Sequence, residues 1–320
     1  METKGNNGLK KGKEKAGKKK YGKGVISENL QIYAMMLPTL ILIFVFCYIP
    51  MYGIVIAFQD YVPGASFFGE GVKWVGFKWF ERFITSHYFF RLIRNTLILS
   101  VLNLLFGFTA PILFALLLDQ IRHAGFKKFV QTTSYMPYFI STVVVVGMVI
   151  SFIDINGLIT NLLAFFGAKP QNYRTSTDAF PWIYTFTNVW KSFGFSSILY
   201  CSIISSIDPG LYEAAKLDGA NRWKQVWHIT LPGLRSVIAI NLIMAVGSVL
   251  SANSEMILLL YTPATYEVAD VVGTYVYRLG ILEAQYSYTT AAGLFVSVIG
   301  FIFTYIANRI SNTLTGFGLW

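Results

Sequence analysis

The sequence predicts an all-α integral membrane protein with six transmembrane helices, and two observations lead to this fold class. Hydrophobic residues make up 54% of the 320 residues and charged residues only 13%, against about 25% in an ordinary soluble domain. Polar side chains are therefore too few to cover a surface in water, in keeping with the mean hydropathy of +0.53. Six apolar runs are each long enough for the roughly 20 residues that a helix needs to cross a bilayer. Because lipid offers no partners for backbone N–H and C=O groups, runs of this length are expected to be helices.

The first 28 residues are expected to form a disordered basic tail in the cytoplasm. Residues 1–23 contain nine lysines, which account for most of the net charge of +10, and they offer few apolar side chains for a core. The high charge therefore reflects the tail and not a nucleic-acid groove. The segment Gly12–Lys19, "GKEKAGKK", lacks the final Ser or Thr of a phosphate-binding loop and also its flanking strand and helix. We expect the tail to approach anionic lipid headgroups and to bind no nucleotide.

The six predicted spans follow one another with polar segments between them. Their approximate bounds are 34–58, 95–118, 131–153, 181–206, 234–260 and 286–308. The fourth span is the least regular, because Asn188 and Lys191 interrupt it. Cys47 and Cys201 both lie inside apolar runs, which predicts two buried thiols and no disulfide framework.

The distribution of Lys and Arg predicts that both termini lie in the cytoplasm. The predicted cytoplasmic segments (1–28, 119–130, 207–233 and the C-terminal end, with Arg235 counted at the span edge) hold 17 of these residues, whereas the outer loops (59–94, 154–180 and 261–285) hold eight. Most of this difference comes from the tail, and Arg82, Arg91 and Arg94 in the first outer loop argue weakly for the opposite orientation. No internal repeat relates the two halves, so the inverted-repeat architecture of many secondary carriers gains no support.

One long polar stretch, "DPGLYEAAKLDGANRWKQVWHITLP" (Asp208–Pro232), lies between the fourth and fifth spans. Asp208 followed by proline predicts the start of a short helix, because aspartate caps a helix and proline suits its first position. Gly219 predicts the end of this helix at a left-handed residue. A second short helix is expected from about Asn221 until Pro232 opens the next span. The sequence therefore predicts two short helices that meet at a bend.

The two predicted helices present different kinds of surface. Small side chains surround the bend and would let another backbone approach closely: Ala214, Ala215 and Ala220. An apolar stripe is expected on the second helix at a spacing of three or four residues: Trp223, Val226, Trp227 and Thr230. Two interpretations stay open at this point, an anchor at the lipid interface and a knob that fits a groove on a cytoplasmic partner. The bend and the alanines favour the knob, because a lipid anchor needs neither.

The same stretch fits the pattern E-A-A, three residues, G, nine residues, I-x-L-P at every fixed position. The matching residues are Glu213, Ala214, Ala215, Gly219, Ile229, Leu231 and Pro232. The stretch resembles the EAA loop of binding-protein-dependent ABC importer permeases, and Asp218–Ala220, "DGA", is similar to the sugar-importing branch. Two further stretches, "YIPMYGIVIAFQDY" and "ADVVGTYVYRLGILEAQYSYTTAAGLF", resemble permeases of the poly- and oligosaccharide subgroup. The resemblance covers essentially residues 30–320.

The resemblance implies a permease subunit that forms half of the translocation pathway of an ATP-driven importer for an oligo- or polysaccharide-derived sugar. In this family a second permease, usually a distinct paralogue, completes the pore. Each EAA loop docks in a cleft on a cytoplasmic ABC ATPase dimer, and an extracellular solute-binding protein delivers the substrate. ATP and Mg²⁺ then belong to the ATPase, so this chain is expected to be no enzyme and to bind no cofactor or metal itself. Its expected location is the bacterial plasma membrane.

The resemblance also assigns roles along the chain. The implied organisation is a basic tail (1–28), a first transmembrane helix with its extracytoplasmic loop (29–94), a permease core (95–310) and a C-terminal tail (311–320). Glu213 and Gly219 occupy the key positions of the coupling loop. The further coupling residues are expected to be Ala214, Ala215, Asp218, Ala220, Trp223, Trp227, Ile229, Leu231 and Pro232.

Polar residues inside the predicted spans are candidates for the substrate path, because a charge at mid-membrane costs at least about 2.5 kcal/mol and requires a cavity or a partner. They are Asn188, Trp190, Lys191, Asn253 and Glu255. Glu255 also has a structural interpretation, a shallow position near the outer interface or a basic partner on a neighbour. The same question arises for Asn188, Trp190 and Lys191. Asn103 and Asn241 are expected to form interhelical hydrogen bonds. The abundant aromatic residues suit a sugar ring but equally suit helix packing, so they do not decide the substrate.

The alternative functions differ in what they require. An ABC permease for a peptide or a polyamine shares the loop, so only the resemblance favours a saccharide. An ion-coupled secondary carrier would transport without an ATPase, and the sequence lacks the internal repeat that such carriers often have. A membrane enzyme needs a cluster of catalytic polar residues at the interface, and no convincing cluster is found; His87, His123 and His228 also lack the spacing of metal ligands. The sequence does not identify the saccharide.

Overall fold

The computed structural model describes residues 23–320, with side chains from Leu30 onward. The predicted basic tail lies largely outside the described residues, as does the "GKEKAGKK" segment. Within residues 23–320 the regular structure is helical, and the strand-like contact found there is an isolated antiparallel bridge between Gln59 and Trp74. The predicted all-α class is therefore confirmed for this part of the chain. By its internal contacts the chain divides after Ile54 into two units, which are described separately.

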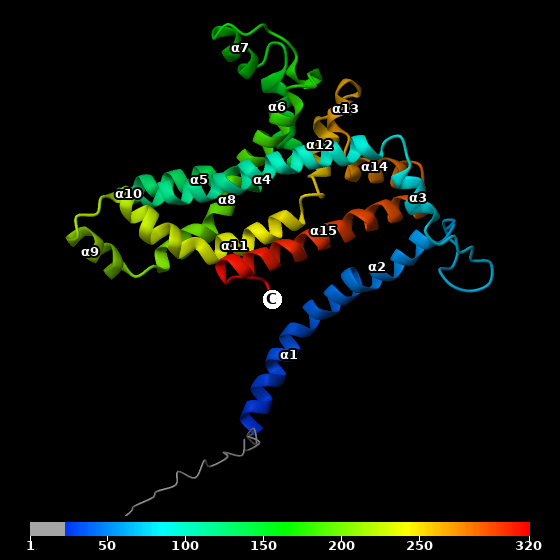
Figure 1. The fold of residues 1–320 in the computed structure, drawn as a ribbon, viewed down its shortest axis with the longest axis horizontal. Coiled ribbons are helices and arrows are strands. Elements are labelled where there is room, and N and C mark those ends of the chain that lie inside the picture. The colour runs from blue at the N-terminus through cyan, green and yellow to red at the C-terminus, as the bar shows by residue number, and fades with distance from the viewer. Residues whose placement is uncertain (1–22) are drawn as a thin grey trace, which may run out of the picture. The chain divides into compact units, whose positions relative to one another are not determined.

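The first unit contains a single helical run. It consists of α1 (Lys23–Ile43), the π-helical segment η1 (Phe44–Tyr48), α2 (Ile49–Met51) and the start of the 3₁₀ segment η2 (Tyr52–Phe58). Figure 1 draws this run in blue. Only 6% of the residues in its most apolar part are buried within the chain. A helix that is apolar on all sides and exposed along its length fits a membrane span.

The second unit contains the remaining helices, most of which are labelled in Figure 1. In chain order they are α3 (Lys78–Ile84), α4 (Phe89–Asp119), α5 (Ala124–Phe139), α6 (Thr142–Ile153), α7 (Leu158–Phe165), η3 (Tyr173–Thr175), α8 (Phe180–Ser206), α9 (Pro209–Leu217), α10 (Arg222–Gln225), η4 (Val226–Thr230), α11 (Leu231–Gly247), α12 (Ser254–Leu260), η5 (Pro263–Thr265), α13 (Tyr266–Ala269), α14 (Val272–Tyr277), η6 (Arg278–Leu282) and α15 (Tyr286–Thr315).

The core of the second unit forms where long helices pack side by side. α4 packs along α8, α5 also packs on α8, and α11 packs along α15 (Figure 1). Leu99 of α4 and Tyr184 of α8 are fully buried in one cluster with Met256 of α12. The helix backbones come very close at Gly194 of α8, whose missing side chain makes room for the carbonyl group of Ser134 in α5. This packing fixes α8 against two neighbours at once.

Two of the predicted spans are interrupted. The predicted run 131–153 divides into α5 and α6, because Ile140 and Ser141 are extended and the hydroxyl of Ser141 caps α6. The predicted run 234–260 divides into α11 and α12, and the side chain of Asn253 caps α12. In both places a side-chain oxygen offers the backbone N–H groups a partner outside the helix. Hydropathy alone therefore predicted one helix in each of these runs, where the structure has two.

Five helical stretches in residues 23–320 are long and apolar enough to cross a membrane. They are Leu30–Phe58, Phe89–Asp119, Thr142–Phe165, Arg222–Gly247 and Tyr286–Thr315. The chain is thus a multi-pass membrane protein. The predicted fourth span corresponds to α8, whose 27 residues include Asn188 and Lys191 and which is not among the five. The third of these candidate stretches begins and ends later than the predicted 131–153, because it takes in both α6 and α7, two helices that residues 154–157 separate.

Candidate functional site

The polar stretch Asp208–Pro232, called the elbow below, folds as two helical pieces around a tight bend. Asp208 begins α9 by accepting a hydrogen bond at Oδ1 from the backbone N–H of Gly210 (2.9 Å). α9 ends shortly before Gly219, whose φ of +75° is a left-handed conformation that glycine adopts readily. Asn221 then begins α10, because its side-chain oxygen accepts a backbone hydrogen bond from the first turn (2.9 Å). The predicted bend is therefore present.

The second helix of the elbow does not end at Pro232. α10 continues through η4 into α11, so the chain is helical without a break from Arg222 to Gly247. Proline in a helix interior lacks an N–H and crowds the carbonyl group of the preceding turn. The π-helical turns of η4 come just before Pro232, which lies in the first turn of α11, and the helix continues through it, so the predicted end does not occur.

The predicted apolar stripe is divided between two faces. Trp223 and Trp227 are 71% and 62% exposed, whereas Val226 and Thr230 are buried. The hydroxyl group of Thr230 lies 3.0 Å from that of Tyr212, and this contact joins η4 to α9. The prediction of one continuous stripe was thus wrong, because two of its four members close the bend from within.

The outward face of the elbow exposes most of the predicted coupling residues. Glu213 is exposed, and Leu217 in the last turn of α9 is 90% exposed. Arg222 holds the elbow to the end of α4 by donating to the carbonyl oxygen of Gln120 (3.3 Å). Of the other predicted coupling residues, Ala214, Asp218, Gly219 and Pro232 are exposed, and Ala215, Ala220, Ile229 and Leu231 are partly buried. Exposed tryptophans beside a charged residue are typical of surfaces that bind another protein.

A cavity of about 640 Å³ lies between α4, α8, α11 and the segment that precedes α12. Each of these four elements contributes one asparagine to its lining: Asn103, Asn188, Asn241 and Asn253. Serine hydroxyls and aromatic rings complete the wall, including Tyr138, Tyr184, Phe195 and Tyr200. Among the described residues that line it there is no charged side chain. The cavity is thus polar, uncharged and partly aromatic.

Hydrogen bonds connect three of these asparagines along the cavity wall. Asn188 donates from Nδ2 to Oδ1 of Asn103 (2.6 Å), and Asn253 donates from Nδ2 to Oδ1 of Asn188 (3.3 Å). The backbone N–H of Asn253 donates to the hydroxyl of Tyr184 (2.9 Å). Asn241 donates to a tyrosine hydroxyl of α8 (3.5 Å). The predicted interhelical hydrogen bonds of Asn103 and Asn241 are present, and the same amides also line the cavity, which the sequence did not indicate.

The five predicted substrate-path residues lie in different surroundings. Asn188 and Asn253 line the cavity. Trp190 is 41% exposed and lies among apolar side chains of α6 and α8. Lys191 is partly buried and donates from Nζ to the hydroxyl of the first residue of α6 (2.9 Å). Glu255 is exposed in the first turn of α12, where the helix dipole favours a negative charge. The cavity wall therefore includes two of the five.

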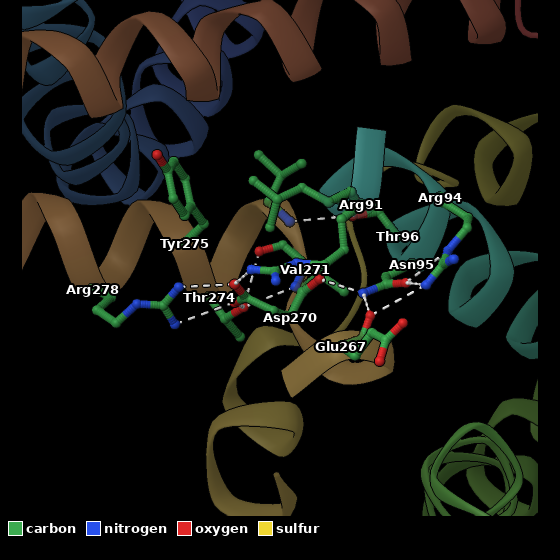
Figure 2. A network of polar contacts seen from close by, with 12 residues as sticks. Arg91, Arg94, Asn95, Thr96, Glu267, Asp270, Val271, Thr274, Tyr275 and Arg278 are labelled. Atoms are coloured by element: carbon green, nitrogen blue, oxygen red, sulfur yellow. Dashed lines mark hydrogen bonds and ion pairs between the residues drawn. The ribbon is translucent and has the colours of Figure 1, made fainter. Parts of the chain in front are cut away.

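A polar network centred on Asp270 lies at the end of the second unit away from the elbow (Figures 1 and 2). The side chain of Asp270 is 1% exposed. Arg278 donates to both of its carboxylate oxygens (3.2 and 2.8 Å), and Thr274 donates its hydroxyl to Oδ1 (2.8 Å). Arg91 of α4 lies 3.5 Å from Oδ2. One buried carboxylate thus pairs with two arginines that are far from each other in the sequence.

The same network joins α4 to the α13–α14 region through backbone groups. Asn95 donates from Nδ2 to the carbonyl oxygens of Glu267 (2.8 Å) and Asp270 (3.0 Å), as Figure 2 shows. The sequence did not reveal this network, because Arg91 falls in a predicted outer loop and gives no sign of a buried partner. The available signal was an acid inside the apolar stretch "VADVVGTYVY", followed eight residues later by Arg278.

Comparison with known proteins gives one family match and close relatives. Residues 107–315 match the family described as "Binding-protein-dependent transport system inner membrane component". The chain is 44% identical over 290 residues to the polygalacturonan/rhamnogalacturonan transport system permease protein of Bacillus subtilis (strain 168), and the match covers 90% of each chain.

Two solved structures are also similar to this chain over nearly its whole length. One is a bacterial ABC transporter involved in the import of the acidic polysaccharide alginate, with 42% identity, a TM-score of 0.81 and coverage of 91% of this chain and 98% of that one. The other is a bacterial alginate ABC transporter in complex with an alginate pentasaccharide-bound periplasmic protein, with 42% identity, a TM-score of 0.82 and coverage of 92% and 98%.

Proposed function

The chain belongs to the family of binding-protein-dependent transport system inner membrane components, and on that premise we propose that it imports an oligosaccharide as a permease subunit. The names of its relative and of the two matched structures have a saccharide solute in common. The observation in the chain itself that carries the proposal is the uncharged cavity lined by amides, hydroxyls and aromatic rings.

The lining of the cavity suits a sugar for chemical reasons. A sugar ring carries hydroxyl groups that both donate and accept hydrogen bonds, and the amides of Asn103, Asn188 and Asn253 do the same. Tyr138 and Phe195, which also line the cavity, are stacked with ring centroids 4.0 Å apart, so each covers one face of the other and the outer faces of the stack are the ones proposed to pack against the apolar side of a sugar. A volume of about 640 Å³ falls within the roughly 300–1,000 Å³ of typical ligand pockets.

The elbow is proposed to couple this chain to a cytoplasmic ATPase. Its bend at Gly219 holds α9 and α10 as a compact projection, and Trp223, Trp227 and Glu213 remain available to a partner. ATP and Mg²⁺ are bound by the ATPase in this proposal, so the present chain transmits motion and performs no covalent chemistry.

The proposal includes six crossings with both termini in the cytoplasm. α8 forms the fourth crossing in spite of its lower hydropathy, because polar residues such as Asn188 face a cavity and not lipid. With this count the elbow, between α8 and α11, lies on the cytoplasmic side, in agreement with the Lys and Arg distribution. A second permease, most simply a paralogue, would form the other half of the pathway.

Transport follows from a shift between inward-open and outward-open states. A ligand shifts such an equilibrium only by its different affinity for the two states. ATP would favour the outward-open state by closing the ATPase dimer on the elbow. A solute-binding protein, of the kind that accompanies one of the matched structures, would favour the same state from outside. Hydrolysis of ATP would return the complex to the inward-open state.

Reconstitution of the complete importer tests this function. The chain, its second permease, the ATPase and the binding protein are placed in proteoliposomes, and uptake of labelled oligogalacturonides is followed with and without internal ATP. We expect uptake that requires ATP and the binding protein. Uptake driven by an ion gradient without the ATPase would identify a secondary carrier, and uptake of peptides or polyamines in place of the saccharide would overturn the substrate class.

A further inference from the structure

Lys191 is a cation in the middle of α8, and the described part of the chain supplies no acidic partner for it. It is partly buried, and its Nζ donates to Oγ1 of Thr142 (2.9 Å). Both ion pairs found within the described residues belong to Asp270, so no carboxylate of this part of the chain lies within 4.0 Å of Lys191. Its one observed partner is a neutral hydroxyl.

The position is unfavourable for a purely structural lysine. Thr142 is the first residue of α6, and the N-terminus of a helix carries a partial positive charge that repels a cation. Burial removes part of the water that would otherwise stabilise the ammonium group. An apolar side chain of the same length would fill the space without these penalties. An anion supplied from outside the chain would offset both the repulsion by the helix N-terminus and the loss of water around the ammonium group.

Lys191 also lies beside the cavity. Asn188 and Phe195, one turn before and one turn after it on α8, both line the wall, as does the adjacent Ser192. Tyr138, close before Thr142 in the chain, lies on the same wall and stacks on Phe195. Since side chains three or four residues apart share a helix face, the flexible stem of Lys191 can bring its ammonium group to the edge of the cavity.

We propose that Lys191 binds the carboxylate of a uronate residue in the substrate and makes this permease selective for acidic oligosaccharides. The inference rests on the proposed import of an oligosaccharide and names its chemical class. Tyr138 and Phe195 take the face of the sugar ring, the asparagines take its hydroxyls, and Lys191 forms a charge-assisted hydrogen bond with its carboxylate. Because the described lining of the cavity contains no charge, Lys191 is the group that distinguishes a uronate from a neutral sugar.

The test compares trigalacturonate with its fully methyl-esterified form in the reconstituted importer. The two sugars share the same backbone and hydroxyl groups, and at each carboxyl position the ester replaces a charge with a methyl group. Lys191→Met removes the charge, Lys191→Arg keeps it, and Lys169→Met, at an exposed outer-loop position, is the matched control. We expect Lys191→Met to reduce uptake of the acid at least about tenfold, as loss of one charge-assisted hydrogen bond predicts. Uptake of the ester should stay unchanged, and Lys191→Arg and Lys169→Met should import the acid normally.

Several results would overturn the inference. Unchanged uptake of the acid by Lys191→Met would do so, and so would an equal decrease for acid and ester. If Lys191→Met and Lys191→Gln both fail to assemble with the second permease while Lys191→Arg assembles, the charge pairs inside the complex and not with substrate. If the unmodified importer takes up the acid but not the ester, uptake of the ester cannot show that a variant is folded. Basal ATP hydrolysis is then measured for that purpose. If it imports neither sugar, the proposed function fails first, and the inference falls with it.

Discussion

Arg278 binds Asp270 with both terminal nitrogens of its guanidinium group, at 3.2 Å from Oδ1 and 2.8 Å from Oδ2 (Figure 2). Burial alone would lower the pKa of Arg278, but the hydrogen bonds and the charge of Asp270 outweigh it and raise the pKa further above its ordinary value. Arg91 of α4 approaches the same carboxylate from another part of the chain. Asp270 therefore joins α4 and η6 to the start of α14.

Asp270→Asn should destabilise the protein strongly. The substitution keeps the shape of the side chain but leaves Arg91 and Arg278 without their anion, and removal of one partner of a buried ion pair costs roughly 3–5 kcal/mol. Because both arginines are partly exposed, we expect a value at the lower end, about 3 kcal/mol. Thermal unfolding of the detergent-purified protein measures the loss. Glu255→Gln, at an exposed acid, is the control, and an equal effect of the two substitutions would contradict the role of the pair.

Gly219→Asp should uncouple the ATPase while the protein still inserts into the membrane. Gly219 has a φ of +75° and no atom near the position of a Cβ, so the new carboxylate projects from the bend into the proposed docking surface. Gly167→Asp is a matched control, because Gly167 is also left-handed (φ +93°) with open space around it but lies in a predicted outer loop. Co-purification of the ATPase and substrate-stimulated ATP hydrolysis should fall for Gly219→Asp alone. Normal co-purification of that variant would count against docking at the elbow.

The elbow was predictable because its signals are local. Asp208, Gly219 and Asn221 act on the backbone within a few residues, and the structure confirms the cap, the bend and the second start. The continuous helix through Pro232 was not predictable, since it depends on the π-helical turns before it. The division of the tryptophan stripe also depends on a partner, Tyr212, that lies 18 residues from Thr230.

Long-range pairing explains what the sequence did not reveal elsewhere. Asn95 bonds to a carbonyl group 175 residues away, and Asn188 bonds to Asn103 85 residues away. The sequence shows that asparagine side chains are unusual in apolar runs, but it does not show which of them line the same cavity. The sequence therefore predicts only helix packing for Asn103, and the fold shows that Asn103 also lines the cavity.

Trp227→Ala should weaken binding of the ATPase without loss of stability. The side chain of Trp227 is 62% exposed in this chain, so little packing within the chain is lost. If it is a central contact of the docked state, its removal should cost at least about 2 kcal/mol of binding, or roughly 30-fold in affinity. Titration of the ATPase onto the purified permease pair measures this change. Trp74→Ala, at a similarly exposed tryptophan of the predicted outer loop, should leave the affinity as it is.

Gly194→Ala should separate α8 from α5. A Cβ at this position would meet the carbonyl group of Ser134 at far less than contact distance, so one helix has to move. Overpacking of this kind costs roughly 1–3 kcal/mol. Gly147→Ala, in α6 with no atom within 4 Å of the new Cβ, should instead leave stability unchanged or raise it by up to about 1 kcal/mol. Thermal unfolding of the two variants tests the contrast, and equal midpoints would show that α5 and α8 are not in close contact.

Asn188→Leu should reduce sugar transport far more than it reduces stability. Asn188 donates to Asn103 and accepts from Asn253, so the substitution interrupts the row of amides that the cavity offers to a substrate. The two freed amides still face the cavity, where water can satisfy them, and the loss of stability should therefore stay below about 1.5 kcal/mol. Uptake of a labelled oligosaccharide should fall at least about tenfold, because apolar branches replace a donor and an acceptor at the middle of the wall.

Trp190→Leu removes a larger side chain two residues further along α8, away from the cavity lining, and serves as the control. Equal uptake by the two variants would mean that the amide row does not contact the passing sugar.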